Sequence, residues 1–235
     1  TPPGTTATFR YYRLGNTGVQ GDWSEALWIG PDGDPWIGGY DPSFEEGGIA
    51  KFVQAEDRWI PVSNVDHKIL GDPNVLGASR VRDIKPDRLG RIWFATWTAL
   101  LRMDPAVGPS SLVRYDLDGL GDLGGGRDVD IAPDGTVWIC AEGTLVQLDP
   151  ASPRRPKQWE GGFEHIAVQP KPSGGYFVWA TLDLSSGTSS PVWRYDSATR
   201  IWEPQPATGE VGEVASLPGT DVVDDAGNMW AFHSD

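Results

Sequence analysis

Short apolar segments recur in pairs along the chain, and a turn built around Pro and Asp separates the two members of each pair. In residues 129–141, an apolar run leads into Pro133 and Asp134 and then into a second run centred on Trp138. Nearly continuous apolar runs of this length are typical of strands covered on both faces, and no helical periodicity is sustained anywhere. The pattern therefore predicts an all-β chain of short antiparallel hairpins.

The Trp-centred hairpin occurs five times, at intervals of about 40 to 60 residues. Its anchoring residues are Trp36, Trp93, Trp138, Trp179 and Trp230. In most copies a further pair of strands follows, as in residues 100–104 and 112–115. Repeats of this size, made of four short strands each, predict a five-bladed β-propeller of four-stranded antiparallel blades. We label the strands of a blade a to d, from the central axis outward.

A single propeller domain is expected to fill residues 1–235. Its blade cores are expected at about 25–62, 80–116, 127–160, 164–204 and 218–235. Residues 6–14 resemble an outer strand, and the fifth copy stops after its second strand. We expect the N-terminal strand to complete the last blade and close the ring, because closure removes exposed sheet edges. The strand that is still missing leaves two alternatives open, a three-stranded last blade or a longer natural chain.

The repeat resembles that of bacterial two-component-regulator propellers. The third copy carries the features of that repeat, with Ile131, Asp134-Gly135, Trp138-Ile139 and Gly143-Thr144-Leu145 at the matching spacing. The fourth copy departs from it at Lys171 and residues 173–175. The resemblance implies an extracytoplasmic sensor or ligand-recognition module, periplasmic or extracellular. Similar repeats occur in lyases and lactonases of the virginiamycin B lyase and gluconolactonase types, whose centre holds a metal.

Composition narrows the choice of partner. The formal net charge is −14 and the isoelectric point is about 4.5, which argues against nucleic acid, because binding phosphates takes clustered Lys and Arg. No stretch is long and apolar enough to insert this segment into a membrane, although a flanking helix could tether it. The single cysteine, Cys140, excludes an internal disulfide and is expected to be buried.

The most conspicuous residues of the repeat are expected to be structural. We expect the five tryptophans to fill the space between neighbouring sheets rather than to contact a ligand. We expect the aspartates of the a–b turns to cap those turns through their side chains. These aspartates are Asp32, Asp87, Asp134 and Asp225.

Function is therefore sought in what differs between the copies. The predicted d–a loops, at 15–25, 63–80, 118–128, 161–165 and 205–220, vary in length and sequence, as binding loops do. They and the b–c connections meet at the axial opening. The candidate ligand-binding residues at this end are Trp23, Tyr40, His67, Arg82, Trp97, Arg127, Asp128, Glu142, Glu164, His165 and His233. Aromatic faces would suit a sugar or peptide group, and Arg would suit a carboxylate.

A metal site is a second possibility. We expect one position of strand a to carry an aspartate in three copies, namely Asp83, Asp130 and Asp221. Carboxylates at this position could bind Ca²⁺. The favoured alternative is that each carboxylate accepts hydrogen bonds from backbone amides of a neighbouring strand or loop. His67, His165 and His233 are not at ligand spacing, which disfavours a transition-metal site.

The leading hypothesis is a non-catalytic recognition module that binds a small polar ligand, a glycan or a protein at the axial opening, within a sensor or envelope protein. No motif of nucleophilic catalysis is present. One alternative is a metal-assisted lyase or lactonase with carboxylates and a His at the axis. Another is a protein-interaction scaffold.

Overall fold

Antiparallel β-sheets make up the part of the chain that the computed structural model describes. That part comprises residues 23–41, 46–62, 80–96, 99–115, 126–141, 143–153, 155–182, 192–205, 222–223 and 229–230. Within these ranges the only helical element is the short 3₁₀ turn η1 (Pro109–Ser111), so the all-β prediction is confirmed. No helix there has the length and apolar character needed to cross a membrane.

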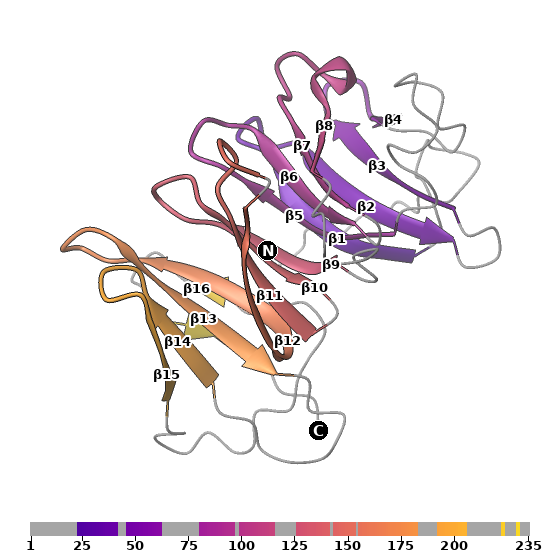
Figure 1. Ribbon diagram of the computed structural model, residues 1–235. Helices are drawn as coiled ribbons and strands as arrows, with labels where there is room; N and C mark the ends of the chain where they lie inside the picture. Colours follow the sequence, from indigo (N-terminus) through magenta and orange to yellow (C-terminus); the bar gives the residue numbers. More distant parts are fainter. Residues whose placement is uncertain are drawn as a thin grey trace, which may run out of the picture.

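The first two sheets have four strands each and follow chain order. The first contains β1 (Trp23–Ile29), β2 (Pro35–Asp41), β3 (Glu46–Val53) and β4 (Arg58–Pro61). The second contains β5 (Val81–Pro86), β6 (Ile92–Thr96), β7 (Leu100–Met103) and β8 (Val113–Tyr115). Both are the four-stranded antiparallel units that the repeat predicts (Figure 1).

The third sheet has seven strands, because one long strand belongs to two repeats. Its members are β9 (Gly126–Ile131), β10 (Val137–Ala141), β11 (Gly143–Leu148), β12 (Lys157–Pro170), β13 (Tyr176–Leu182), β14 (Val192–Asp196) and β15 (Ile201–Gln205). The first half of β12 pairs with β11, and residues 163–170 pair with β13. The predicted loop at residues 161–165 is therefore wrong. Gly162, at φ +74°, lets the backbone bend there without leaving the sheet.

The C-terminal repeat contributes the hairpin of β16 (Val222–Val223) and β17 (Met229–Trp230). The described strands thus form sheets of four, four, seven and two strands, none of which closes on itself. Residues 6–14, which are expected to complete the ring, lie outside the described part of the chain.

The first strands of successive repeats lie next to one another. We call β1, β5, β9 and residues 163–170 of β12 the inner strands. β5 contacts both β1 and β9, and β9 contacts β12 in turn. The sheets therefore follow one another in chain order, with their inner strands side by side (Figure 1).

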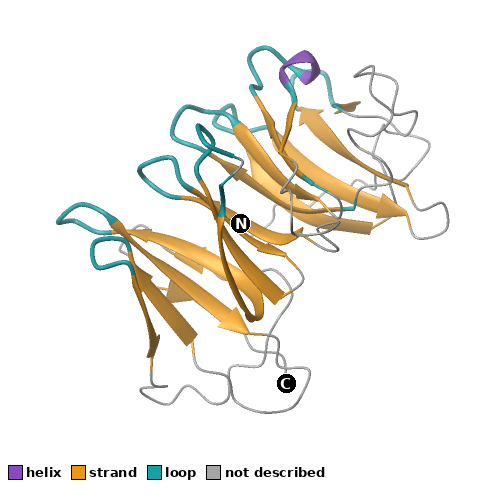
Figure 2. Cartoon of the chain, in the orientation of Figure 1, coloured by secondary structure: helices purple, strands orange, loops and turns teal. Residues whose placement is uncertain are grey.

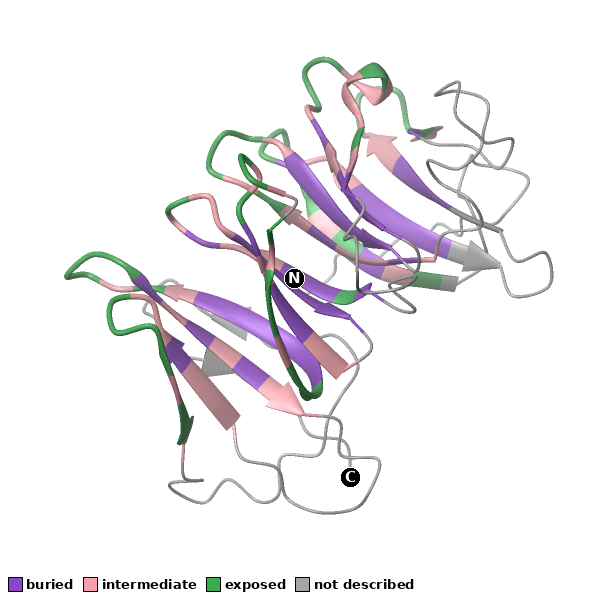
Figure 3. Ribbon diagram, viewed as in Figure 1, coloured by how far each residue is buried: buried purple, intermediate pink, exposed green. Residues whose placement is uncertain are grey.

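The core lies between neighbouring sheets, where Figure 3 shows the buried strand segments. Trp36 packs in one cluster with Ile84 of the next inner strand, and Trp93 packs in another with Val129. Trp138 and Cys140 are fully buried in the third cluster. The prediction that the repeat tryptophans pack between sheets is thus confirmed for these three, and so is the predicted burial of the cysteine. Trp179 is only partly buried.

The turns also follow the sequence prediction. Backbone amides donate hydrogen bonds to the carboxylates of Asp32, Asp87 and Asp134 at 2.9–3.2 Å. The turn-capping prediction is confirmed for these three, and Asp225 lies outside the described residues. The described loops gather along one side of the molecule (Figure 2). The starts of the inner strands lie at the opposite end of the sheets.

Candidate functional site

Each of the four inner strands has a β-bulge near its start. The pairing with the second strand of the blade skips one residue in every case. All four skipped residues are charged, and we call them the bulge row: Glu25, Arg82, Arg127 and Glu164. One charged residue thus occupies the equivalent place on each inner strand.

A bulge explains how these side chains can be charged in strands that are otherwise buried. The extra residue is left out of the strand pairing, and the local bend redirects its side chain. Without the bulge, strict alternation would send every second side chain into a packed face of the sheet. Bulges occur preferentially next to functional sites, and here they place four charges at one end of neighbouring strands.

Two ion pairs organise the bulge row. Arg127 donates through Nη1 to Oε1 of Glu164, and the side chains are 41% and 9% exposed. Arg80, which immediately precedes β5, donates through Nε and Nη2 to the two carboxylate oxygens of Glu25. In the first pair Glu164 is thus nearly buried, whereas the side chain of Arg127 is accessible to solvent.

Arg82 lies among these four charges. Burial lowers the pKa of its guanidinium group, and the positive charges of Arg80 and Arg127 lower it further, whereas Glu25 and Glu164 act in the opposite direction. Three arginines and two glutamates therefore share this end of the inner strands.

Below the bulge row, toward the a–b turns, lies a second group of charged side chains. We call it the buried polar cluster: Asp83, Lys85, Asp128, Asp130 and His165. Asp83, Asp128 and His165 come directly after a bulge on β5, β9 and β12. Lys85 and Asp130 lie two residues further along their strands.

The pairing with the tryptophan strand corrects one sequence prediction. Asp130 pairs with Trp138, and the residue that pairs with Trp93 is Lys85. Asp83 therefore corresponds to Asp128 rather than to Asp130. Pro86 is the last residue of β5, whereas Pro133 lies within the turn after β9, so an alignment on Pro-Asp shifts the strands by two residues.

The aspartates of the cluster join neighbouring inner strands. Oδ2 of Asp83 accepts a hydrogen bond from the backbone N of Val129 at 3.1 Å. Oδ2 of Asp130 accepts one from Val168 at 2.7 Å. The favoured alternative to a metal site is thus confirmed for Asp83 and Asp130. Asp128 makes the same kind of bond, to the backbone N of Ile166 at 2.9 Å.

The protonation states of the cluster differ from residue to residue. Burial raises the pKa of Asp83 well above its usual value, and its hydrogen bond with Asp128 adds to the increase. Burial acts to raise the pKa of Asp128 too, but the hydrogen bond with His165 and the charge of Lys85 hold it below its usual value. The pKa of Asp83 therefore lies above that of Asp128, its hydrogen-bonded neighbour.

Lys85 supplies the positive charge of the cluster. The negative charge of Asp83 raises the pKa of Lys85, and the charges of Asp128 and Asp130 add to the increase. Burial raises the pKa of Asp130 to about 6, although Lys85 opposes the change. His165 completes the group on the β12 side, where its Nδ1 lies 3.6 Å from Oδ2 of Asp128.

No group of three or more His, Cys, Asp or Glu side chains in the described ranges is arranged to hold a metal ion. A calcium site formed by Asp83, Asp130 and Asp221 stays a prediction, because Asp221 lies outside those ranges. Carboxylate oxygens of Asp83 and Asp130 would be the described donors for such a site, and both residues already accept backbone hydrogen bonds.

The structure brings five of the predicted ligand-binding residues together: Arg82, Arg127, Asp128, Glu164 and His165. Trp23 and Tyr40 pair through their backbones at the same end of the first sheet, and their side chains lie outside the described part. Four more candidates lie outside the described residues: His67, Trp97, Glu142 and His233. Sequence reasoning missed Lys85, whose signal was a charge within an apolar inner strand.

Comparisons with known proteins identify the class of fold. No family model matches the sequence, and no curated protein matches it. The structure is similar to the extracellular domain of a one-component system from B. thetaiotaomicron, with a TM-score of 0.63 and 19% identity, over 93% of this chain and 29% of that one. It is also similar to a catalytically inactive virginiamycin B lyase from Staphylococcus aureus, with a TM-score of 0.58 and 14% identity, over 95% and 73% of the two chains.

A third similar structure is the extracellular domain of a hybrid two-component system from B. thetaiotaomicron, with a TM-score of 0.53 and 13% identity, over 91% of this chain and 29% of that one. The chain thus spans about 29% of the length of the first of these proteins. At such identities the likeness shows the fold, which is all-β and propeller-like. These proteins are of the two kinds that the sequence repeat resembles.

Proposed function

We propose that this protein is a non-catalytic recognition module that binds a small polar ligand at the bulge row. The observation that carries the proposal is the repeated bulge, which places Glu25, Arg82, Arg127 and Glu164 at equivalent positions of four inner strands. A bulge costs strand pairing, and four of them at one level favour a shared use of the residues that they redirect. Ordered charges at one end of a rigid scaffold are suited to polar recognition.

We further propose that the chain forms a five-bladed ring of four-stranded blades, closed by residues 6–14. The fifth Trp-centred hairpin, β16 and β17, follows the fourth repeat, and β16 contacts β12 as the other inner strands contact their predecessors. The exposed Leu27 and Ile29 of β1 agree with closure, since the neighbouring inner strands bury Ile84 and Ile166. A closing blade would cover that apolar face.

The resemblance to extracellular domains of one- and two-component systems supports a periplasmic or extracellular location and a role in sensing. A metal-assisted lyase or lactonase is the alternative suggested by the likeness to virginiamycin B lyase. We favour a recognition module over an enzyme because the aspartates of the described inner strands accept hydrogen bonds from the backbone of the next strand. These carboxylates therefore stabilise the fold.

Neutral replacements in the bulge row test the proposal. A library of immobilised oligosaccharides and small polar metabolites is screened, and each ligand found is titrated calorimetrically with Arg82→Gln and Arg127→Gln. Each replacement should weaken binding about tenfold or more, since hydrogen bonds to charged groups contribute about 1.5–3 kcal/mol. Gln retains donors for Glu164, so the unfolding midpoint should change little.

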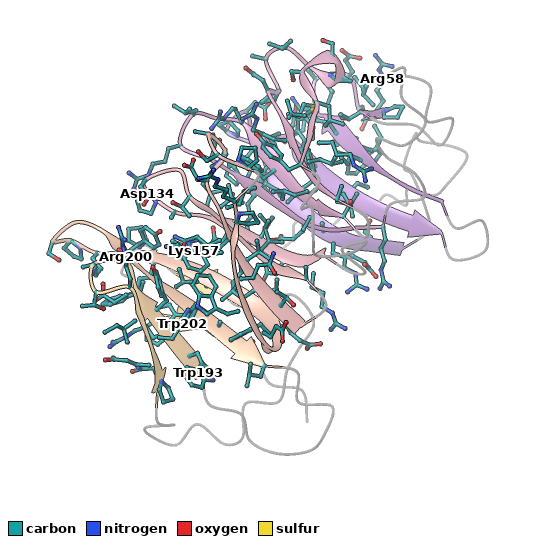
Figure 4. All side chains as sticks on the ribbon, viewed as in Figure 1. Arg58, Asp134, Lys157, Trp193, Arg200 and Trp202 are labelled. Carbon is teal, nitrogen blue, oxygen red and sulfur yellow. The ribbon has the colours of Figure 1, made fainter. Side chains whose placement is uncertain are left out.

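Arg58→Gln is the matched control. Arg58 is an exposed residue of β4 (Figure 4). It pairs with the exposed Glu56, and its replacement should leave binding unchanged. Equal binding by wild-type protein and both bulge-row variants would refute the proposed site. A large drop in midpoint in either variant would assign that arginine a structural role instead.

A further inference from the structure

Lys85 differs from Lys51 and Lys171, two other lysines of the described sheets. Nζ of Lys51 lies 2.5 Å from Oδ2 of Asp32, and Lys171 pairs as closely with an aspartate, at 2.6 Å. In the described ranges, the nearest carboxylate oxygen to Nζ of Lys85 is Oδ1 of Asp83, at 3.8 Å. That distance is too long for a hydrogen bond. The ammonium group of Lys85 therefore attracts Asp83 without a direct hydrogen bond to it.

Lys85 and Asp83 are accessible to solvent even though they belong to an inner strand. Their side chains are 35% and 19% exposed. They lie two residues apart on β5, so the alternation of the strand places them on the same face. Asp83 directly follows the bulge at Arg82. At about 3.3 Å per residue, both members of the pair lie within about 10 Å of that bulge along the strand, which is within reach of a small ligand.

The carboxyl group of Asp83 is held in place and still has room for a ligand. Its Oδ1 accepts a hydrogen bond from the backbone N of Ile84 at 2.8 Å, and its Oδ2 accepts one from Val129 at 3.1 Å. Each carboxylate oxygen can accept two hydrogen bonds, so each retains capacity for one more, and the ammonium group of Lys85 carries three donors. The pair therefore offers a donor and an acceptor side by side, in a position fixed by backbone contacts.

A hydroxyl group fits between these two side chains. An oxygen atom about 2.8 Å from both Nζ and Oδ1 spans their separation of 3.8 Å. Such an oxygen accepts a hydrogen bond from Lys85, and its own O–H donates to Asp83. A charged group fits less well. An anion would face Asp83 and its neighbours Asp128 and Asp130, and a cation would face Lys85.

We propose that Lys85 and Asp83 bind a hydroxyl group of the ligand, and that the ligand is a neutral, hydroxyl-rich compound such as a sugar or a polyol. The inference rests on the proposed function and names the class of ligand for the same end of the inner strands. The bulge row adds side chains of the same kinds, because arginine donates hydrogen bonds to a hydroxyl oxygen and glutamate accepts them from a hydroxyl hydrogen.

myo-Inositol is the probe, because it is neutral and hydroxyl is its only functional group. In protein labelled with ¹³C-lysine, the Cε–Hε signals of the lysines are followed during titration at pH 7.5. A saturable shift is expected for Lys85, with a dissociation constant on the order of 1–10 mM, as suits a ligand of about twelve heavy atoms. Lys51 and Lys171 are internal controls, since each already contacts an aspartate closely, and their signals should not shift.

Replacing Lys85 with Met tests its role in binding. The amide signal of Val129, whose N–H donates to Asp83, reports on binding in the variant. Lys85→Met should weaken the binding of myo-inositol about tenfold or more, since hydrogen bonds to charged groups are the stronger ones. Lys157→Met, at an exposed position of β12, should leave the binding unchanged. The lysine signals of the wild-type protein decide the question by themselves if the Lys85 variant does not fold.

Acetamide and acetate are the comparison probes, since an amide also donates and accepts hydrogen bonds and acetate is an anion. Both should bind more weakly than myo-inositol. The hydroxyl assignment would be overturned by the absence of a saturable shift at Lys85 with myo-inositol, by equal shifts of the three lysine signals, or by tighter binding of either comparison probe at Lys85.

The results also separate this inference from the proposed function. A library ligand whose binding depends on Arg82 and Arg127, without any shift at Lys85 on titration with myo-inositol, would overturn the hydroxyl inference alone. A saturable shift at Lys85 with myo-inositol, together with no library ligand that depends on the bulge row, would support the hydroxyl inference and count against the bulge row as the binding site.

Discussion

Replacing Trp138 with Ala should lower the free energy of unfolding by about 4 kcal/mol, within the range for large aromatic side chains in a core. Trp138 is fully buried and lies at the centre of the aromatic cluster of the seven-stranded sheet. Its ring stacks on Trp159, with centroids 5.5 Å apart, and contacts Tyr195 at 5.0 Å. The edge of Trp202 completes the packing, and Figure 4 shows that residue on the outer strand β15. Urea unfolding followed by circular dichroism measures the loss.

Trp179→Ala is the matched control, because Trp179 occupies the same repeat position on β13 but is only partly buried. The Trp179→Ala replacement should lower the free energy of unfolding by about half as much, since the side chain buries less apolar surface. If the Trp138 variant lost less than the Trp179 variant, the packing role assigned to the repeat tryptophan would be wrong.

Replacing Lys85 with Met should lower the free energy of unfolding by about 2 kcal/mol at pH 7.5. Removing one partner of a buried charge pair typically costs about 3–5 kcal/mol, and the cost is reduced here because the Lys85 side chain is 35% exposed. Met keeps the apolar stem, so the change reports the charge that faces Asp83, Asp128 and Asp130. Urea unfolding at several pH values measures it.

The loss should depend on pH. The folded-state pKa of Asp130 is about 6, above its ordinary value of 3.8, so its protonated form favours the folded state at low pH. That contribution is fully present below about pH 3.8 and is lost as the pH rises through about 6. Asp83 shifts in the same direction. At pH 4.5 the carboxyl group of Asp130 is largely protonated, and the deficit of the Lys85 variant should fall below about 1 kcal/mol.

The exposed Lys157 gives a control, since Lys157→Met should change stability by no more than about 0.5 kcal/mol at either pH. A deficit of the Lys85 variant that is the same at pH 4.5 and 7.5 would contradict the assignment of Lys85 as the counter-charge of the cluster.

Residues with a repeated structural role could be predicted from the sequence. Trp93 and Trp138 lie between sheets, and Asp87 and Asp134 cap their turns, because each depends on local pattern and burial alone. The sequence predicts a loop at Gly161 and Gly162, since paired glycines usually mark a connection between strands. The structure uses them to bend a strand that stays paired, and the sequence contains no local signal that distinguishes these outcomes.

The candidate site was predicted in part. Arg82, Arg127, Asp128, Glu164 and His165 were found because they lie where inner strands were expected to begin. The bulges were not predicted, because one extra residue interrupts the two-residue period without changing composition. The spatial relation of Asp83 to Asp128 depends on strand register, and the Pro-Asp that was used to align the repeats lies at the end of β5 in one copy but within the turn after β9 in the other.

The most direct test of the account is a map of backbone amide shifts when the protein is titrated with a ligand from the library screen. The account predicts the largest shifts at the four bulges, that is, at Glu25, Arg82, Arg127 and Glu164 and the residues next to them. The outer strands β4, β8 and β15 and the a–b turns should shift little. Shifts concentrated on those outer strands or turns, with the bulges unchanged, would contradict the central claim that the bulge row is the binding site.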